Sequence, residues 1–209
     1  MKKGMKEIKY LNEIEIEVDG KIYTITKDNA IKEYAGFKWR VLEEQSDGTL
    51  LVLDNKLPKE IMEKVFNKNL LDSDGNIKFS YNSDNWRWSD SPIRMGLNSK
   101  FLEMLNIDDL VEMKTTTKLN GEIDVTRDYV RIPSKEEYES MDKEIRGMSD
   151  PQGSVLKWSL SPFYFDGAYS YVFLVNTSGQ LNYNDVSGGG AVAPVIKLKT
   201  DVFDRIVGK

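Results

Sequence analysis

Three short apolar motifs follow one another along the chain and constrain any fold it can adopt. They occupy Ser91–Arg94 (SPIR), Trp158–Pro162 (WSLSP) and Ala193–Leu198 (APVIKL). Serine followed by proline is favoured at a helix start, because the hydroxyl accepts a free backbone N–H and proline has none to satisfy. The other two motifs indicate core strands, and the stretch between them is rich in Tyr, Asn, Asp, Ser and Gly. We therefore expect a helix and core strands that support a displayed polar surface.

Alternating apolar and polar residues around Asp-Gly and Asn-Gly pairs predict β-hairpins. Such pairs separate residues 14–18 from 21–26 and 37–44 from 50–53, and Asn120-Gly121 follows the threonine-rich extended segment 110–119. In the second hairpin we expect an inward face of Trp39, Val41, Leu50 and Val52. Residues 28–34 are expected to form a polar connector or one helical turn.

The remaining pattern mixes short strands with helices. Strands are predicted at residues 129–132, 155–160, 171–175, 180–183 and 192–198. Helices are predicted at 59–66, at 91–105, and from a capping box at Ser134 through Met141. The fold class is therefore α+β, with a mostly antiparallel sheet and two main helices. We expect an N-terminal hairpin arm over residues 1–35 and one domain over residues 36–209.

Composition excludes several kinds of chemistry, because the sequence contains no cysteine and no histidine. Disulfides, thiolate nucleophiles, imidazole bases and Cys/His metal sites are therefore ruled out. Asp72–Asn76 has two acids and a glycine at the spacing of half a calcium loop, but the later bidentate glutamate is missing. We predict a plain turn there, and neither a metal nor another cofactor.

Charge and hydropathy limit the classes of partner that we expect for this chain. The net charge is −5, with acidic and basic residues mixed along the chain, so no basic stripe suits nucleic acid. Met1-Lys2-Lys3 is not followed by the apolar region of a signal peptide, and no window resembles a membrane span. We expect no nucleic-acid partner, no membrane insertion and no signal peptide.

Five motifs in order carry a resemblance to a known family. They lie at residues 36–42, 89–101, 133–138, 158–162 and 194–198. Over about residues 36–199 the chain resembles the bacterial and phage domain of unknown function six-two-seven-three. The resemblance implies a C-type-lectin-like fold, shared by formylglycine-generating enzymes and by the variable ligand-binding proteins of diversity-generating retroelements. Two family arginines are absent here, one from the WSLSP motif and one at Ala193, and so are the copper-binding cysteines of the enzymes.

This resemblance implies a non-enzymatic recognition module, a tail-associated receptor-binding component of a phage or prophage. Its partner would be a protein or carbohydrate on a cell surface, or another virion protein, with a homo-oligomer as a further possibility. The chain would then work in a virion or in the cytoplasm. One alternative is a structural virion or assembly protein without a ligand. A weaker one is a glycan hydrolase that uses Asp166 and Asp185 as a carboxylate pair.

The candidate ligand surface lies between the second and third motifs. Its composition is that of an adaptable recognition surface, since aromatic rings supply area and small polar groups supply hydrogen bonds. The residues expected to contact a ligand there are Tyr164, Asp166, Tyr169, Asn182, Tyr183, Asn184 and Asp185. Strand alternation is expected to turn Val172, Leu174 and Leu181 inward and to leave Tyr171, Phe173 and Tyr183 facing outward or at edge positions. The alternative is that these are ordinary loops whose tyrosines are half-buried.

Three further features lie outside this surface or at its end. Trp86 and Trp88 lie in a polar loop and form a second candidate ligand site, with one of the two expected in the core. Arg94 lies in the first turn of its helix, where the helix dipole disfavours a cation, so we expect a carboxylate partner in neighbouring Asp90. Gly188–Gly190 is expected to be a flexible bend before the last strand.

Overall fold

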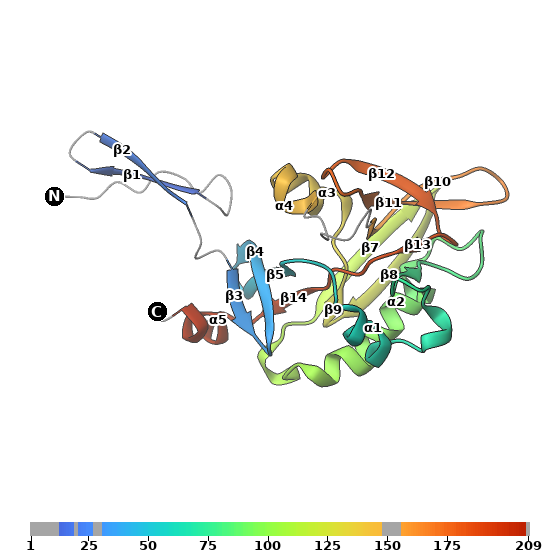
Figure 1. The fold of residues 1–209 in the computed structure, drawn as a ribbon, viewed down its shortest axis with the longest axis horizontal. Helices are drawn as coiled ribbons and strands as arrows, with labels where there is room; N and C mark the ends of the chain where they lie inside the picture. Colours follow the sequence, from blue (N-terminus) through green and yellow to red (C-terminus); the bar gives the residue numbers. More distant parts are fainter. Residues whose placement is uncertain (1–12, 19–20, 27–30, 148–155, 208–209) are drawn as a thin grey trace.

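The computed structural model describes residues 13–18, 21–26, 31–147 and 156–207 (Figure 1). Within them the chain is α+β, and every pair of strands is antiparallel, as predicted. β1 (Glu13–Val18) and β2 (Lys21–Thr26) form the predicted N-terminal hairpin as a sheet of their own. The Asp-Gly turn expected between them lies outside the described residues.

The largest sheet has five strands in the order β3-β4-β5-β14-β9. Their bounds are β3 Ile31–Tyr34, β4 Phe37–Gln45, β5 Gly48–Leu53, β14 Val195–Leu198 and β9 Val130–Arg131. β3 corrects the connector expected at residues 28–34. Ala35 and Gly36 both have positive φ (52° and 78°), and this tight turn brings β3 back onto β4. Residues 31–34 therefore belong to the main sheet and not to the arm.

A second sheet, β10-β11-β12, carries the stretch between the second and third motifs. Its strands are β10 Lys157–Phe165, β11 Ser170–Val175 and β12 Leu181–Asp185. β10 runs past Pro162, further than the predicted strand, with register shifts on either side of that proline. β6 (Ile77–Lys78) pairs with β13 (Gly189–Gly190). The predicted flexible bend is therefore a two-residue strand, in which a Cβ on Gly190 would lie 2.6 Å from Trp158 Nε1.

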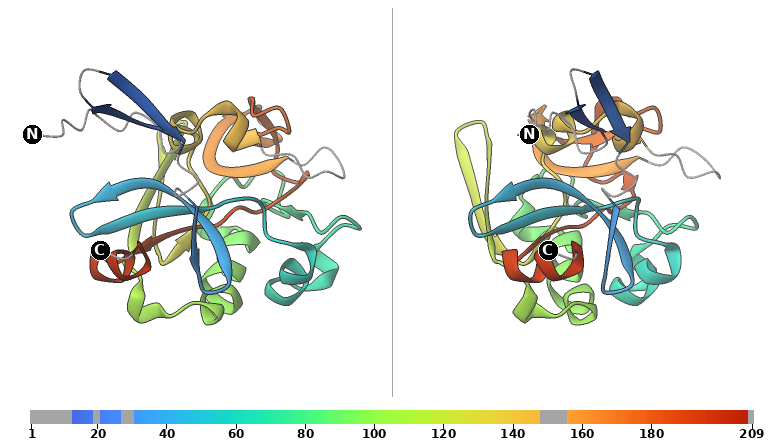
Figure 2. Two further views of the ribbon diagram at one scale, coloured as in Figure 1. Left: turned by 60° about the vertical axis from the view of Figure 1, so that its left-hand side comes forward. Right: turned by 90° about the vertical axis from the view of Figure 1, so that its left-hand side faces the viewer.

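The Asn120-Gly121 turn joins β7 (Met113–Leu119) to β8 (Glu122–Asp128). Both turn residues have positive φ (51° and 84°), as a two-residue hairpin of this type requires. Figure 2 shows this hairpin as a long ribbon along one side of the molecule, and β7 lies against β10. Its inner face is polar and buried, with Thr115 and Thr117 on one strand and Asp124, Thr126 and Asp128 on the other.

The described residues contain five α-helices, more than the two main helices expected. They are α1 Lys59–Val65, α2 Pro92–Gly96, α3 Lys135–Ser140, α4 Lys143–Gly147 and α5 Thr200–Val207. Single-turn helices lie at Lys68–Leu70, Trp88–Asp90, Leu102–Met104 and Ile107–Asp109, and a π-turn at Leu97–Phe101 extends α2. The Ser91 cap with Pro92 at the first position and the Ser134 capping box are confirmed.

The core lies between the main sheet and the helices and continues under β10 and β11. Ile93, Leu97 and Phe101 are fully buried, which confirms the helical spacing of the first motif. The inward face expected for the β4–β5 hairpin is wrong in part. Trp39 pairs with Leu53 and Val41 with Leu51, so these four share a face, whereas Leu50 and Val52 pack on the opposite face with Met113 and Val195. A register shift between Val41 and Glu43 interrupts the pairing that starts at the turn, and a shift of one residue moves the side chains beyond it to the other face.

Candidate binding surface

Five aromatic side chains lie together on the β10–β12 sheet, and we call them the aromatic face. They are Phe163, Tyr164, Tyr171, Phe173 and Tyr183. Phe163 stacks on Tyr183 with 4.2 Å between ring centroids, and Tyr164 stacks on Tyr171 at 6.1 Å. Phe163, Tyr164 and Tyr183 remain 40%, 51% and 49% exposed. The rings therefore support one another and still present a large surface to solvent.

Strand register explains how these rings meet. Tyr164 pairs with Tyr171, and Phe173 pairs with Tyr183, so all four side chains share one face of the sheet. The register shift between Pro162 and Tyr164 then allows Phe163 to join the same face, although it is Tyr164's neighbour in the chain. β-bulges commonly redirect a side chain in this way.

The alternation predicted for this hairpin is confirmed on β11 but wrong at one residue of β12. Val172 and Leu174 are buried in the core, while Tyr171 and Phe173 are only partly buried. Leu181 was expected to face inward, opposite to Tyr183. Residues two apart on a strand point the same way, and Leu181 pairs with Val175 on the aromatic side of the sheet.

The polar residues predicted to bind a ligand do not all join the aromatic face. Asn182 and Asn184 pair with Leu174 and Val172, which places them on the opposite side of β12. Asp185 pairs with Tyr171 and accepts a hydrogen bond from the Ser187 N–H at 2.6 Å. Of these three, only Asp185 therefore shares a face with the rings.

Asp166 closes the turn between β10 and β11. Its Oδ1 accepts hydrogen bonds from the N–H groups of Tyr169 (2.7 Å) and Ala168 (2.9 Å), and its Oδ2 accepts from the Tyr171 hydroxyl at 3.3 Å. The backbone hydrogen bond from Tyr169, followed by that from Ala168, lowers the pKa of Asp166. Tyr169 itself is exposed on this turn. Asp166 therefore holds the turn in shape at the margin of the aromatic face.

The two tryptophans of the second candidate site have different environments. Trp88 is fully buried, and its Nε1–H donates to Asp128 Oδ2 at 3.0 Å, so it belongs to the core and not to a ligand surface. Trp86 lines a cleft of about 320 Å³. The cleft, which we call the Trp86 cleft, is lined by Asn82, Asp84, Asn85, Trp86, Arg87, Leu119, Asn120, Glu122 and Phe165.

Three separate segments build this cleft: the loop 82–87, the tip of the β7–β8 hairpin and the end of β10. Arg87 bridges the first two, with its Nη2 2.5 Å from Glu122 Oε2. Ser170 ties the loop to β11, because its N–H donates to the Ser83 carbonyl (2.6 Å) and its hydroxyl to the Asp84 carbonyl (2.7 Å). Sequence reasoning found Trp86 but missed the rest of the cleft, since no short-range pattern connects the three segments.

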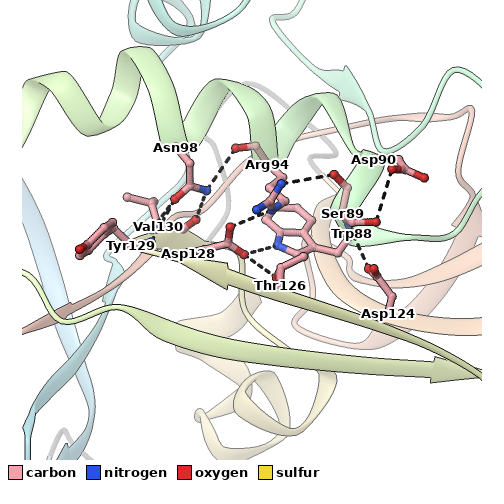
Figure 3. Close-up of polar contacts among 10 residues, drawn as sticks. All are labelled: Trp88, Ser89, Asp90, Arg94, Asn98, Asp124, Thr126, Asp128, Tyr129 and Val130. Carbon is pink, nitrogen blue, oxygen red and sulfur yellow. Dashed lines mark hydrogen bonds and ion pairs between the residues drawn. The ribbon is translucent and has the colours of Figure 1, made fainter.

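A buried polar network holds β8 against α2 and the loop before it (Figure 3). The Asp128 carboxylate accepts from Thr126 Oγ1 at 2.6 Å, Arg94 Nε at 2.7 Å and Trp88 Nε1 at 3.0 Å. The partner expected for Arg94, Asp90, is therefore wrong; the strand brings in Asp128 from a distant part of the chain. Ser89 N–H also donates to Asp124 Oδ2 at 2.9 Å. Trp88 and Ser89 directly follow the loop 82–87, so their bonds to Asp128 and Asp124 anchor the end of that loop to β8.

Asn98 extends the same network toward β9. Its Nδ2 donates to the Val130 carbonyl at 2.6 Å and to the Arg94 carbonyl at 3.2 Å. Its Oδ1 accepts from the N–H groups of Tyr129 (3.0 Å) and Val130 (3.1 Å). Asn98 lies in the π-turn after α2 and departs from helical geometry (φ −91°, ψ 15°), so the irregular turn places its amide beside the strand.

Asp72 forms the plain turn that the sequence predicts. Its Oδ1 accepts from the N–H groups of Asp74 and Asn76, each at 2.9 Å, and Gly75 has the positive φ (81°) that such a turn favours. Within the described ranges, no three His, Cys, Asp or Glu side chains gather as a metal site would require. No helix in that part of the chain is long and apolar enough to cross a membrane.

Comparison with known proteins adds no relative to this description. No family model matches the chain, and no curated protein and no solved structure matches it. The aromatic face and the Trp86 cleft are therefore interpreted from their own geometry and chemistry.

Proposed function

We propose that this chain is a non-enzymatic recognition module that binds a macromolecular partner through the aromatic face. The observation that carries the proposal is the contact of Phe163 with Tyr183 and of Tyr164 with Tyr171, with three of these four rings 40–51% exposed. Contiguous exposed aromatic surface on a soluble protein marks interaction sites. Tyrosine is also enriched among the residues that dominate binding energy.

The packing of the rings suits a binding surface. Rings that already contact each other lose little conformational freedom when a partner covers them, so more of the interaction energy remains for affinity. Lys135 on α3 lies 5.3 Å from the Phe173 ring and adds a cation at one margin. Asp166 and Asp185 add carboxylates on the β10–β12 hairpins. A hydrophobic centre with a polar rim is the usual anatomy of a protein interface.

The orientation of the rings favours a protein over a sugar at this face. Phe163 and Tyr183 cover one another's faces, with 4.2 Å between centroids and 23° between ring planes, and Tyr164 and Tyr171 lie offset at 6.1 Å and 27°. Phe163 and Tyr183 thus occupy faces on which a sugar would pack, while exposed Tyr164 and Tyr183 offer ring area and hydroxyl groups that suit the side chains and amides of a protein partner. We infer that the ligand is a protein on a cell surface. We further propose that this chain has a C-type-lectin-like fold and works in the tail of a phage or prophage.

The test is binding of the labelled full chain to a panel of bacterial cells, measured by flow cytometry. Wild type should bind at least one strain, and protease treatment of the cells should remove binding while periodate oxidation of their glycans should not. The double variant Tyr164→Ala/Tyr183→Ala should bind at least tenfold more weakly, a loss of about 1.4 kcal/mol or more. Tyr81→Ala is the matched control, because Tyr81 is as exposed as Tyr183 and lies outside the aromatic face.

Three results would contradict the proposal. Binding that survives in the double variant would place the surface elsewhere. Loss on periodate but not on protease treatment would assign the face to a carbohydrate. Absence of binding to every strain, combined with self-association in sedimentation velocity that the double variant abolishes, would favour the assembly alternative.

A further inference from the structure

The indole N–H of Trp86 differs from those of the other three tryptophans. The others donate to protein acceptors: Trp39 to the Tyr34 carbonyl at 3.0 Å, Trp88 to Asp128 at 3.0 Å and Trp158 to the Ile77 carbonyl at 2.8 Å. Trp86 is only 6% exposed, yet no acceptor for its N–H is found among the described residues. A tryptophan buried to this degree usually finds a hydrogen-bond partner, so this donor calls for an explanation.

The Trp86 N–H is not sealed inside the protein. Within the described ranges, Trp86 Nε1 has no hydrogen-bond partner but is not fully buried, so the N–H keeps contact with solvent. Trp86 lines the Trp86 cleft, and this is the concave surface from which a ligand could reach it. A donor held on a nearly buried ring at the wall of a cleft suits a ligand that carries an acceptor.

The cleft offers further polar groups in a fixed arrangement. Asn85 is occupied, since its Oδ1 accepts from the Arg87 N–H (3.0 Å) and its Nδ2 donates to Asp90 (3.1 Å). The side chains of Asp84 and Asn120 have no hydrogen-bond partner among the described residues, and both line the cleft. Ser170 fixes the backbone at Asp84, so this carboxylate projects from a loop that is already held in place.

The charges select against an anionic ligand. Asp84 and Glu122 carry two negative charges, and the one cation of the lining, Arg87, is engaged by Glu122. A phosphate or carboxylate would meet an excess of negative charge and would have to compete for Arg87. The apolar parts of the wall are Trp86, Phe165 and Leu119. The charges thus leave neutral and cationic ligands, and the Trp86 N–H needs an acceptor, which an ammonium group lacks. A neutral ligand with an apolar face and groups that both donate and accept hydrogen bonds fits both conditions.

We propose that the Trp86 cleft binds a small neutral saccharide. The C–H face of a sugar can pack on the partly exposed ring of Phe165, since the Trp86 ring is nearly buried and has Arg87 over it. Sugar hydroxyls can accept from the Trp86 N–H while donating to the Asp84 carboxylate and the Asn120 carbonyl oxygen. The cleft volume of about 320 Å³ lies at the small end of the range for ligand sites, which suits a mono- or disaccharide. This site is separate from the aromatic face and does not depend on the function proposed for it.

The experiment titrates the full chain with neutral sugars at millimolar concentrations. The probes are glucose, galactose, mannose, rhamnose, N-acetylglucosamine and their common disaccharides, with glucose 6-phosphate as a charged counterpart, followed by saturation-transfer NMR and calorimetry. At least one neutral sugar should bind saturably at one site. The phosphorylated sugar should bind at least tenfold more weakly than glucose, or not at all.

Two variants test the named groups. Trp86→Phe keeps a ring and removes the N–H, and Asp84→Asn changes only an exposed side chain; each should weaken the best sugar at least tenfold. Asp74→Asn, an exposed acid outside the cleft, should leave affinity unchanged. So should the double variant Tyr164→Ala/Tyr183→Ala, which separates this site from the aromatic face. No saturable binding of any neutral sugar by wild type, or unchanged affinity in Asp84→Asn, would overturn the proposal.

Discussion

Replacing Asp128 by asparagine tests the network that joins β8 to α2. The Asp128 side chain is fully buried and accepts three hydrogen bonds, from Thr126, Arg94 and Trp88. Asparagine has the same shape but no charge, and its NH₂ group is a donor. At least one of the three donors would therefore face another donor in the variant. We expect Asp128→Asn to fold and to be clearly less stable than wild type.

The magnitude follows from the two strongest contacts. Breaking a buried ion pair by removing one partner costs about 3–5 kcal/mol. Arg94 is 28% exposed, so water recovers part of its loss. Trp88 is fully buried, and a buried donor left unpaired costs about 1–3 kcal/mol. Because asparagine retains one acceptor oxygen, these losses do not add in full, and we expect a net decrease in the free energy of unfolding of about 3 kcal/mol.

The assay is urea denaturation followed by tryptophan fluorescence, with thermal unfolding in parallel. A loss of about 3 kcal/mol corresponds to a fall in Tm of roughly 6–12 °C for a chain of this size. Asp90→Asn is the matched control, because Asp90 is exposed and was the partner expected from sequence. It should change stability by less than about 0.5 kcal/mol. Near-wild-type stability of Asp128→Asn, or an equal loss in Asp90→Asn, would refute the reasoning.

Three further predictions concern the core and its ionisation. Leu97→Ala should lower the free energy of unfolding by about 2–5 kcal/mol in urea, since Leu97 is fully buried; an unchanged midpoint would contradict its place in the core. Gly190→Ala should lower Tm more than Gly189→Ala, because its Cβ would lie 2.6 Å from Trp158 Nε1, whereas the nearest atom to a Cβ on Gly189 is an Asp72 carboxylate oxygen 3.0 Å away; equal Tm values would count against this packing. Burial lowers the pKa of Lys157 from 10.5 to about 8, so the unfolded chain binds more protons between these pH values and stability should rise with pH there. Lys157→Met should remove that rise in urea titrations at several pH values, and an unchanged slope would show that Lys157 is not its source.

Local patterns predicted much of the fold. The Ser91 cap, the Ser134 capping box and the Asn120-Gly121 turn were all identified, because each depends on residues within a few positions of one another. The hairpins and the buried helix face followed from periodicity in the same way. The prediction was wrong where a local pattern permitted two structures. The short polar sequence of β3 has no strand pattern of its own, and it is a strand because it pairs with β4.

The candidate site, too, was predicted in part from local patterns and depends in part on strand pairing. Composition located the aromatic face within residues 163–190, and alternation placed Tyr171, Phe173 and Tyr183 on its outer side. The inclusion of Phe163 required the register shift at Pro162, which depends on how β10 pairs with β11. The separation of Asn182 and Asn184 from the rings also depends on strand pairing.

The sequence by itself determined where helices begin, where hairpins turn, and which chemistries a chain without cysteine and histidine cannot use. Tertiary structure alone decided the partner of Arg94, the burial of Trp88 and the assembly of the Trp86 cleft from three segments. The physical reason is how far apart in the sequence the interacting residues lie. Caps and turns are stabilised by bonds between near neighbours, whereas a buried ion pair or a cleft wall depends on which distant strand packs against it, and that choice is made by the fold as a whole.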